Sequence, residues 1–267
     1  ILLRCGYVHG EYLETINGNT CRTRLYQWLE SKAFRSAAHC QLPTVELAEW
    51  VRKRYKISKK KISVIPNFVD TDLFKPAGGI KLRKKTVVSV GRLSRVKRFH
   101  LLIEACAGIF GCELTIVGEG VERAKLEQQA RELGLKLTLT GYIENESLVR
   151  FLQEHSVFAI VSEWEGHPKA LIEAMSCGMP CVGVSANGIN EVICNGDNGL
   201  LVGLSLDSLR EGISSVFKDN KFRKKLSENA RNSVIQKYSF KNCFSRERCL
   251  LESIIEKAPM NAMIDSE

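Results

Sequence analysis

The sequence lacks the features that mark several classes of protein. No apolar run approaches the roughly 18 residues that a membrane-spanning helix needs, which excludes a transmembrane helix. The first residues, Ile1–Leu3, have neither the basic start nor the small-residue cleavage site of a signal peptide. There is no internal repeat and no low-complexity tract. Because the chain opens on Ile1 and not on Met, we expect it to begin inside a domain.

Paired cysteines are also missing. None of the ten cysteines belongs to a Cys-x-x-Cys pair, although structural zinc sites depend on such spacing. Disulfide frameworks are typical of small secreted domains, and several cysteines here, such as Cys106 and Cys181, lie inside apolar runs. We therefore interpret them as buried free thiols of a cytoplasmic protein, with no metal or other cofactor.

Nucleic-acid binding is not expected, although the net charge is +9. The basic stretches Lys59–Lys61, Lys81–Lys85 and Lys221–Lys225 are spread along the chain. They lack the regular interleaving with aromatic residues that stacks bases. With 44% hydrophobic and 26% charged residues, the composition is that of a globular protein of one large domain or two small ones. Part of the positive charge is expected to face an anionic ligand or an acidic membrane surface, and most of it solvent.

From residue 86 onward, strand-like and helix-like segments alternate. The apolar runs expected as strands are Thr86–Val90, Glu113–Val117, Leu135–Thr140, Val157–Val161 and Pro180–Val184. The helical segments between them are His100–Phe110, Glu122–Leu133, Leu148–Glu154 and Ala170–Cys177. Such alternation predicts a parallel sheet with helices on both faces, and runs that are apolar throughout indicate burial of both faces. The expected fold is a doubly wound, Rossmann-like α/β domain.

The two ends of the chain do not show this alternation of strand and helix. The first part contains expected helices over Tyr26–Ala38 and Val45–Tyr55, and a strand over Ile62–Ile65. The segment Phe74–Gly79 combines proline and glycine, which break helix and strand, so we place a domain boundary there. The carboxyl end is expected to form consecutive helices over Leu206–Lys218, Phe222–Lys237 and Phe240–Glu256, with a frayed tail after Lys257.

The residues after each strand are the first place to look for chemistry, because ligands of open parallel sheets bind outside the carboxyl ends of the strands. These residues are Gly91-Arg92, Gly118-Glu119-Gly120, Gly141-Tyr142-Ile143 and Ser162–Pro168. Glycine permits close approach of backbone to a ligand. Arg92 by a forked contact and Lys97 as a point charge could hold a diphosphate; the alternative is a pair of solvated surface cations.

Two carboxylates flank the start of an expected helix. Glu165 and Glu173 are separated by Gly166-His167-Pro168-Lys169-Ala170-Leu171-Ile172. The free N–H groups at a helix start form an anion site, and Glu173 could accept hydrogen bonds from a ribose diol. The alternative is that Glu173 is an acid in the first turn whose negative charge only stabilises the helix through the helix dipole.

The order of these motifs resembles glycosyltransferase family four (group 1). Residues 165–180, Glu-Gly-His-Pro-Lys-Ala-Leu-Ile-Glu-Ala-Met-Ser-Cys-Gly-Met-Pro, are similar to its E-x7-E signature. Val90–Leu93 with Lys97 resembles its donor phosphate loop. Further matches to its interdomain linker and its downstream block are Ile65–Thr71, Phe74–Pro76, Gly188–Ile193 and Gly196–Val202. The matches run in family order from about Tyr26 to Ile255.

The resemblance implies a GT-B fold with a complete carboxyl-terminal donor domain. Residues 1–72 would be the end of the acceptor-side, amino-terminal Rossmann-like domain, and 73–240 the nucleotide-sugar-binding domain. Residues 241–267 would be a helix and tail that pack back on the amino-terminal domain. More than 100 residues of the family's amino-terminal domain would precede Ile1.

The resemblance also assigns roles to residues. Arg92 and Lys97 would stabilise the leaving diphosphate, and Glu165 would lie against the sugar and phosphates. His9 would match a family histidine near the sugar, the alternative being an exposed loop histidine. The residues that would bind the nucleotide sugar are Gly91, Gly118, Gly120, Tyr142, Ile143, Leu148, Gly166, His167, Pro168, Lys169, Ala170, Leu171 and Glu173.

The function expected from the resemblance is a retaining, metal-independent hexosyl transfer in polysaccharide biosynthesis. The donor would be a UDP- or GDP-sugar and the acceptor a glycan or a lipid-linked glycan, with peripheral association at the inner face of the membrane. A nicotinamide dehydrogenase is disfavoured, because the first turn reads Gly91-Arg92-Leu93-Ser94 and not G-x-G-x-x-G. The alternative function is a truncated nucleotide-sugar-binding module without catalytic turnover.

Overall fold

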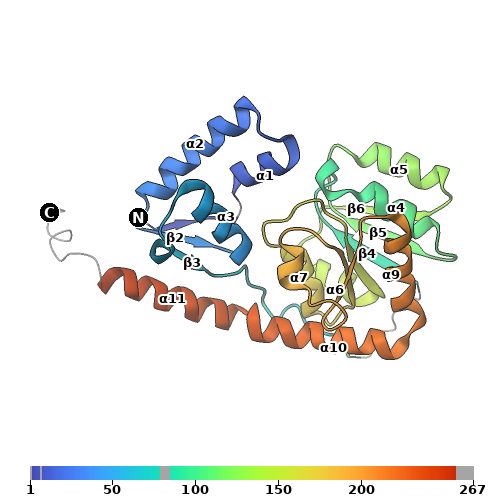
Figure 1. Cartoon of the computed structure of the whole chain (residues 1–267). Helices are drawn as coiled ribbons and strands as arrows, with labels where there is room; N and C mark the ends of the chain where they lie inside the picture. The colour runs from blue at the N-terminus through green and yellow to red at the C-terminus, as the bar shows by residue number, and fades with distance from the viewer. Residues whose placement is uncertain (1, 7, 79–84, 257–267) are drawn as a thin grey trace. The chain divides into compact units, whose positions relative to one another are not determined.

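The structure is a computed structural model that describes residues 2–6, 8–78 and 85–256. The backbone divides into two compact units (Figure 1). The first contains the described residues up to Asn67 together with those from Phe240 on, and the second contains those of Phe68–Ser239. The tail after Lys257, where fraying was expected, lies outside the described residues.

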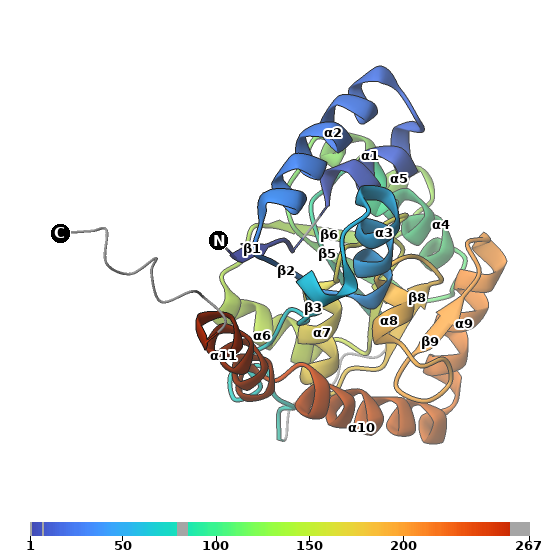
Figure 2. The same ribbon diagram turned by 60° about the vertical axis from the view of Figure 1, so that its left-hand side comes forward.

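The first unit is built on a small parallel sheet. Its strands are β1 (Leu2–Arg4), β2 (His39–Leu42) and β3 (Ile62–Val64), paired in that order (Figure 2). Its helices are α1 (His9–Asn17), α2 (Cys21–Ser36), α3 (Val45–Tyr55) and α11 (Phe240–Glu256), with a 3₁₀ turn η1 over Lys59–Lys61. The apolar core of this unit includes Phe34 of α2, Leu42 of β2 and Val51 of α3.

Local chemistry explains the bounds of α3. The Thr44 hydroxyl accepts a hydrogen bond from the Leu47 N–H at 3.2 Å and caps the first turn. Leu47, Val51 and Tyr55 recur at helical spacing and are buried. The helix ends at Lys56, which adopts the left-handed conformation with φ 54°.

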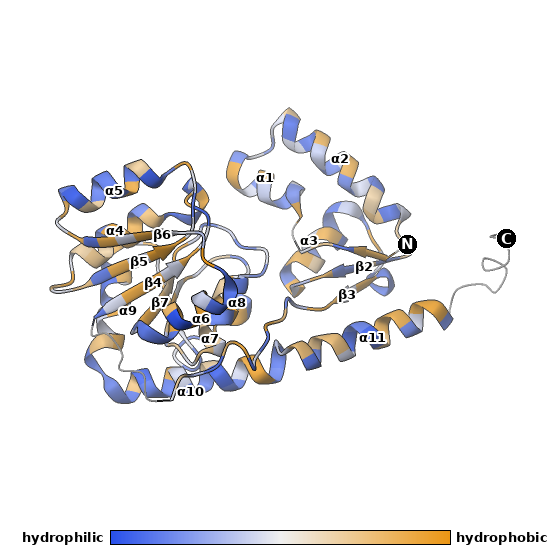
Figure 3. Ribbon diagram, turned by 180° about the vertical axis from the view of Figure 1, so that it is seen from behind, coloured by the Kyte–Doolittle hydropathy of each residue, from blue (hydrophilic) through white to orange (hydrophobic). Residues whose placement is uncertain are grey.

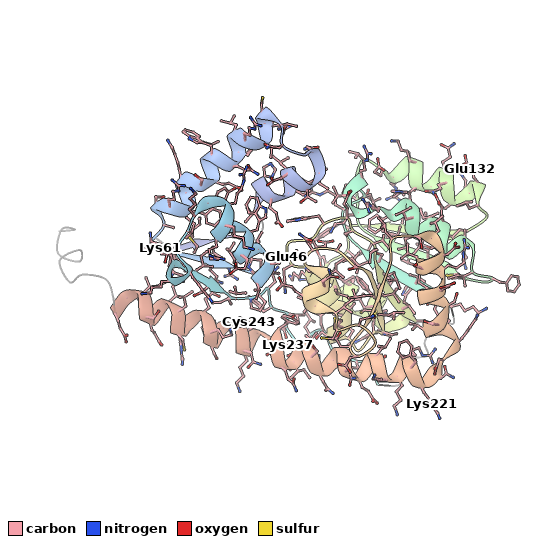
Figure 4. The ribbon with its side chains drawn as sticks, in the orientation of Figure 1. Glu46, Lys61, Glu132, Lys221, Lys237 and Cys243 are labelled. Carbon is pink, nitrogen blue, oxygen red and sulfur yellow. The ribbon has the colours of Figure 1, made fainter. Side chains whose placement is uncertain are left out.

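The last helix belongs to the first unit, although the whole second unit separates it from the rest in sequence. Cys243 of α11 is buried (Figure 4). Arg246 Nη2 donates a hydrogen bond to the carbonyl oxygen of Val64 at 2.7 Å, and Glu247 pairs with Arg4 at 3.0 Å. The first unit is therefore discontinuous in the sequence.

The second unit contains a six-stranded parallel sheet. The strands are β4 (Thr86–Val90), β5 (Glu113–Val117), β6 (Lys136–Gly141), β7 (Val157–Ile160), β8 (Cys181–Val184) and β9 (Leu200–Val202). Their order is β6-β5-β4-β7-β8-β9, and every pair is parallel. The chain reverses its direction of winding between β4 and β7, which makes their carboxyl ends the switch point of the sheet. This topology confirms the doubly wound α/β fold.

Helices cover both faces of this sheet (Figure 1). One face packs against α4 (Phe99–Ala107), α5 (Arg123–Glu132) and α9 (Leu206–Lys218). The other packs against α6 (Asn145–Glu154), α7 (Lys169–Ser176), α8 (Ile189–Val192) and the second half of α10 (Asn220–Lys237). Successive strand residues alternate between the two cores, as Val157 and Phe158 do. The strands are accordingly among the most hydrophobic segments of the chain (Figure 3).

Two expectations about this unit need correction. The expected strand over Leu135–Thr140 is not apolar throughout: Lys136 and Thr138 of β6 are exposed, because β6 is an edge strand of the sheet. The expected linker is described as far as Gly78, and it is not a free connection. The chain passes from the first unit to the second at Asn67–Phe68, and Phe74 is buried in the core of the second unit.

A hydrogen-bond clamp holds this entry segment. Arg231 of α10 donates from Nη1 to the carbonyl oxygens of Phe74 and Ser176, and from Nη2 to that of Thr71, at 2.8 to 2.9 Å. The two ends of the unit also pair, since the Val69 N–H donates to the Tyr238 carbonyl oxygen at 2.9 Å. The second unit therefore begins and ends at neighbouring positions.

The ten cysteines are free thiols. Six are buried, as expected, but Cys21, Cys194 and Cys249 are exposed and Cys5 is half-buried. Apolar sequence context therefore predicts the burial of Cys106 and Cys181. For cysteines in polar sequence surroundings, the sequence does not tell whether the side chain is buried: Cys243 is buried and Cys249 is exposed.

Candidate functional site

The loops after β4 and β7 meet at the switch point of the sheet in the second unit. The loop after β4 runs from Gly91 through the 3₁₀ turn η2 (Arg95–Lys97) into α4. The Glu163 N–H donates to the Val96 carbonyl oxygen at 2.9 Å and joins the two loops. Two ion pairs reinforce the contact, Lys97 with Glu165 and Arg98 with Glu163, each at 2.5 Å.

The Lys97–Glu165 pair is the best-shielded ion pair at this position. The side chains are 24% and 12% exposed, so the pair is only partly screened by solvent. The Lys97 stem runs past Gly91, where a Cβ would lie 3.3 Å from Lys97 Cε. The structure thus confines an ammonium group above the end of β4, with a carboxylate as its present partner. An incoming phosphate oxygen could replace or share that partner.

Arg92, the other cation expected to bind phosphate, lies on the same loop. It is exposed, and it forms no ion pair with any residue that the structure describes. Its guanidinium therefore keeps its hydrogen-bond donors available for an anion.

Glu173 lies in the second turn of α7, the helix that follows the loop carrying Glu165. Glu173 is only 5% exposed, although it is an acid in a short helix that begins at Lys169. Burial raises the pKa of its carboxyl group, and Lys169 opposes the shift from 3.5 Å. A buried carboxylate with one distant partner has lone pairs left for donors such as hydroxyl groups.

His167 is also buried in this loop. Its ring packs edge-on against Tyr238, with centroids 5.4 Å apart. Burial lowers its pKa to about 4, so the imidazole is neutral near pH 7. A neutral ring can orient a ligand by hydrogen bonding, but it adds no positive charge to the site.

Two glycines at the rim serve backbone packing. A Cβ on Gly118 would lie 2.0 Å from the Gly91 carbonyl oxygen, and one on Gly120 would lie 2.2 Å from that of Leu93. The Leu93 N–H donates to the Glu119 carbonyl oxygen at 2.8 Å. The loop after β4 fills the space where a Cβ of either glycine would lie, and the contact of both glycines with a nucleotide sugar stays a prediction. They hold that loop in place.

The remaining predicted site residues differ in their surroundings. The side chains of Leu148 and Leu171 are buried in the apolar core, and their place in the binding set stays a prediction. Tyr142 is 83% exposed, and Ile143 packs against the same core. His9 opens α1 of the first unit, where its N–H donates to Glu30 Oε1 at 2.7 Å, so its proposed role near the sugar stays a prediction.

Sequence reasoning missed the Arg98–Glu163 pair and the part that Gly188 plays. Gly188 has φ 76°, and a Cβ there would lie 2.5 Å from the Glu165 carbonyl oxygen. The loop after β8 therefore packs directly on the loop that carries Glu165. Gly188 opens the downstream motif, which was the available signal. Among the residues described, no group of three or more His, Cys, Asp or Glu could hold a metal ion.

The same chain segments match models of known protein families. A model described as glycosyl transferases group 1 matches residues 70–233, more than half of the chain. The chain belongs to the group 1 glycosyl transferases. A second model, described as glycosyltransferase family 4, matches residues 5–73 of this group 1 glycosyl transferase.

Curated relatives extend the match. The chain is 30% identical over 252 residues to UDP-Gal:alpha-D-GlcNAc-diphosphoundecaprenol alpha-1,3-galactosyltransferase of Escherichia coli, covering 87% of this chain and 64% of the relative. It is 26% identical over 209 residues to N-acetyl-alpha-D-glucosaminyl L-malate synthase of Bacillus anthracis, covering 73% and 55%. This group 1 glycosyl transferase thus spans somewhat more than half the length of these relatives.

Solved structures show the fold. Sucrose-phosphate synthase from Thermosynechococcus elongatus superimposes with a TM-score of 0.87 at 20% identity, over 96% of this chain and 68% of that one. Anabaena HepE, in complex with UDP and glucose, gives a TM-score of 0.83 at 21% identity, over 94% and 71%. Together with the parallel Rossmann-like sheets, they confirm the GT-B fold of this group 1 glycosyl transferase. None of the helices described is long and apolar enough to cross a membrane.

Proposed function

We propose that this chain binds a nucleotide-diphosphate sugar in its second unit and, within the whole enzyme, transfers the hexose with retention of configuration. The donor would be a UDP- or GDP-sugar, the acceptor a glycan or a lipid-linked glycan. The observation that carries the proposal is the confined Lys97 ammonium at the switch point, with Arg92 exposed on the same loop. Family membership supports transfer as the reaction.

The proposed roles follow from charge. Transfer breaks the bond between the anomeric carbon and the β-phosphate oxygen and forms one to an acceptor oxygen, so negative charge grows on the leaving diphosphate. Lys97 and Arg92 would neutralise that charge without a bound metal, and stabilisation of developing charge is usually the largest catalytic contribution. Glu165 would hold Lys97 until the donor arrives.

Glu173 would bind the ribose. Its carboxylate could accept hydrogen bonds from the two ribose hydroxyls, which would offset the cost of keeping a carboxylate buried. The other residues of the predicted binding set would line the same site through the backbone of Gly166–Ala170, next to the start of α7. His9 would reach the sugar from the first unit.

The names of relatives support the donor and acceptor classes. The Escherichia coli relative is named for UDP-galactose and a diphosphoundecaprenol acceptor, and HepE was solved with UDP and glucose. We propose by analogy that this chain acts in the cytoplasm at the inner face of a membrane. We propose further that residues 1–72 and the carboxyl-terminal helix serve the acceptor side.

The test is calorimetric titration of the purified chain with UDP, GDP and ADP, each without metal. We expect UDP or GDP to bind, and Lys97→Ala or Glu173→Ala to weaken binding about tenfold or more. Lys136→Ala is the matched control, because Lys136 also forms an ion pair, with Glu113 at 2.8 Å, but at the opposite end of the sheet. Equal affinity in parent and both site variants would refute the site.

Turnover separates the two functions expected from the sequence. A chain that binds nucleotide sugar and transfers the sugar to an acceptor is an enzyme, and the anomeric proton coupling of the product reports retention or inversion. A chain that binds nucleotide but never transfers sugar is a binding module. Binding without transfer would be a statement about the chain tested, which spans 64% and 55% of the length of the two relatives above, and not about the whole enzyme.

A further inference from the structure

The outward face of α2 in the first unit carries large apolar side chains. Leu25, Trp28 and Leu29 are 57%, 53% and 50% exposed. Their spacing places them on one side of the helix, and α2 shows both hydrophobic and hydrophilic residues along its length (Figure 3). Exposure of three adjacent large apolar residues on one helix face is typical of a surface that meets another phase or partner.

The inward face of the same helix is fixed by polar contacts. Thr23, Gln27 and Phe34 are buried. Glu30, the only acidic residue of α2, accepts hydrogen bonds from the N–H groups of His9 and Gly10 and from the Tyr55 hydroxyl, at 2.7 to 2.8 Å. The rotation of α2 about its axis is therefore set, and its single negative charge is turned away from the apolar face.

Positive charges surround the apolar side chains. Arg22, Arg24, Lys32 and Arg35 are exposed. Lys32 Nζ lies 3.9 Å from the centroid of the Trp28 ring, so the cation sits directly beside the apolar patch. No acidic side chain of α2 lies among them. In α11, by contrast, the exposed apolar residues Leu251 and Ile255 are each followed by an exposed glutamate, Glu252 or Glu256.

We infer that residues 22–35 of α2 dock on an anionic lipid bilayer. Leu25, Trp28 and Leu29 enter the interface between headgroups and acyl chains, and the four cations contact anionic headgroups. Interfacial helices combine a strongly basic polar side with leucine and tryptophan on the other, and tryptophan prefers the membrane interface. This inference rests on the membrane association proposed above and names the surface that makes it.

The charges favour a bilayer over a second copy of the chain. In a two-fold dimer through this face, the cations of one α2 would lie against those of the other, and like charges across an interface cost binding energy. An anionic bilayer instead neutralises all four.

The experiment compares binding of the whole chain to vesicles of phosphatidylcholine and to vesicles of equal parts phosphatidylcholine and phosphatidylglycerol. We expect binding to the anionic vesicles alone, weakened by salt. Arg22→Gln with Lys32→Gln should reduce it about tenfold or more, since each cation contributes about fivefold. Leu25→Gln with Leu29→Gln should reduce it at least as much.

Matched controls lie in the second unit. Phe110→Gln removes an apolar side chain that is 94% exposed, and Lys221→Gln with Lys224→Gln removes two exposed cations of α10; both should leave vesicle binding unchanged. Brominated lipids should quench tryptophan fluorescence in the parent, and Trp28→Phe should remove most of the quenching, because Trp164 is buried and Trp50 packs against the core of the first unit.

Three results overturn the inference: no preference for anionic vesicles, equal binding by the α2 variants and the parent, or a concentration-dependent dimer that the Leu25→Gln/Leu29→Gln variant abolishes. The nucleotide titration tests the donor site separately. Nucleotide binding without vesicle binding refutes the α2 surface alone. Vesicle binding that depends on α2, in a chain that binds no nucleotide, supports the surface and refutes the donor site.

Discussion

Single side chains near the switch point have their charge set by burial. Glu173 and His167 lie on one loop and helix start, and burial shifts the pKa of the acid up and that of the base down. Each shift disfavours the charged form of a buried side chain. Because His167 adds no positive charge near pH 7, the cations Lys97 and Arg92 are the groups expected to attract an anion.

His167 should make stability depend on pH. Its pKa is about 4 in the folded chain, against an ordinary value of 6.5. Between these values the unfolded chain binds more protons, so stability is complete above pH 6.5 and falls by up to about 3 kcal/mol as the pH drops toward 4. Urea unfolding at several pH values should show a flatter profile for His167→Phe, which keeps a ring against Tyr238. Parallel profiles would contradict this prediction.

The sequence identifies the site residues only in part. Arg92, Lys97 and Glu165 could be chosen because the carboxyl ends of parallel strands meet at one edge of a sheet. The ion pair between Lys97 and Glu165 could not be predicted, since it depends on how two loops pack. The burial of the Leu148 and Leu171 side chains could not be predicted either, because a motif position does not say which way a side chain points. Helical phase relative to the core decides that.

Contacts between neighbouring loops hold the candidate site together. The loops after β4 and β5 contact each other through backbone atoms, and the loop after β8 packs on that of β7. A side chain at a contact glycine would push two elements apart. The positions of Lys97 and Glu165 therefore depend on residues that touch no ligand.

Gly120→Ala should destabilise the second unit. Its Cβ would lie 2.2 Å from the Leu93 carbonyl oxygen, and such overlap with backbone costs about 2–4 kcal/mol. Gly78→Ala is the control, because a Cβ there meets nothing within 4 Å. Thermal unfolding followed by circular dichroism measures both. An unchanged midpoint for Gly120→Ala would show that the two loops separate without cost.

Arg231→Ala should loosen the segment that enters the second unit. The substitution leaves the carbonyl oxygens of Thr71, Phe74 and Ser176 without their charged donor, and we expect a loss of about 3 kcal/mol. Lys221→Ala, at the start of the same helix (Figure 4), should change stability by less than about 0.5 kcal/mol. Hydrogen exchange at residues 70–76 should rise in the first variant alone. A small effect on both would mean that Phe74 alone anchors the segment.

Secondary structure was predictable wherever an element is long or strongly apolar. The expected helix Val45–Tyr55 and strand Glu113–Val117 have the observed bounds. The short elements α8 and β9 were missed, since three or four residues carry no measurable periodicity. The boundary at Asn67 was also missed, because proline and glycine break helix and strand without marking a change of unit.

The whole molecule combines a continuous unit with a discontinuous one. The second unit has its own two apolar cores and a complete sheet, whereas the first depends on α11 for contacts to β3 and Arg4. We therefore expect the second unit to fold and to bind nucleotide independently of the first unit.

Residues 68–239 should fold when expressed alone. We expect a cooperative unfolding transition and nucleotide affinity within about threefold of that of the whole chain, because the hydrogen bonds and ion pairs given above for the donor loops join residues of this unit. Calorimetry with the nucleotide that the whole chain binds provides the measurement. Deletion of 240–267 should instead increase proteolysis within the first unit and leave nucleotide binding intact. A fragment that aggregates or stays unfolded would show that the second unit needs the first.

The pairing of Val69 with Tyr238 has a consequence for the entropy of folding. Arg4 and Glu247 are 243 residues apart, so closing their contact in an unfolded chain means closing a very long loop. Once the second unit has folded, residues 69 and 238 are joined, and the effective loop shrinks to about seventy residues. Loop closure then costs about 1 kcal/mol less. Folding of the second unit thus lowers the entropic cost of forming the first. The favourable order of folding is therefore the second unit before the first.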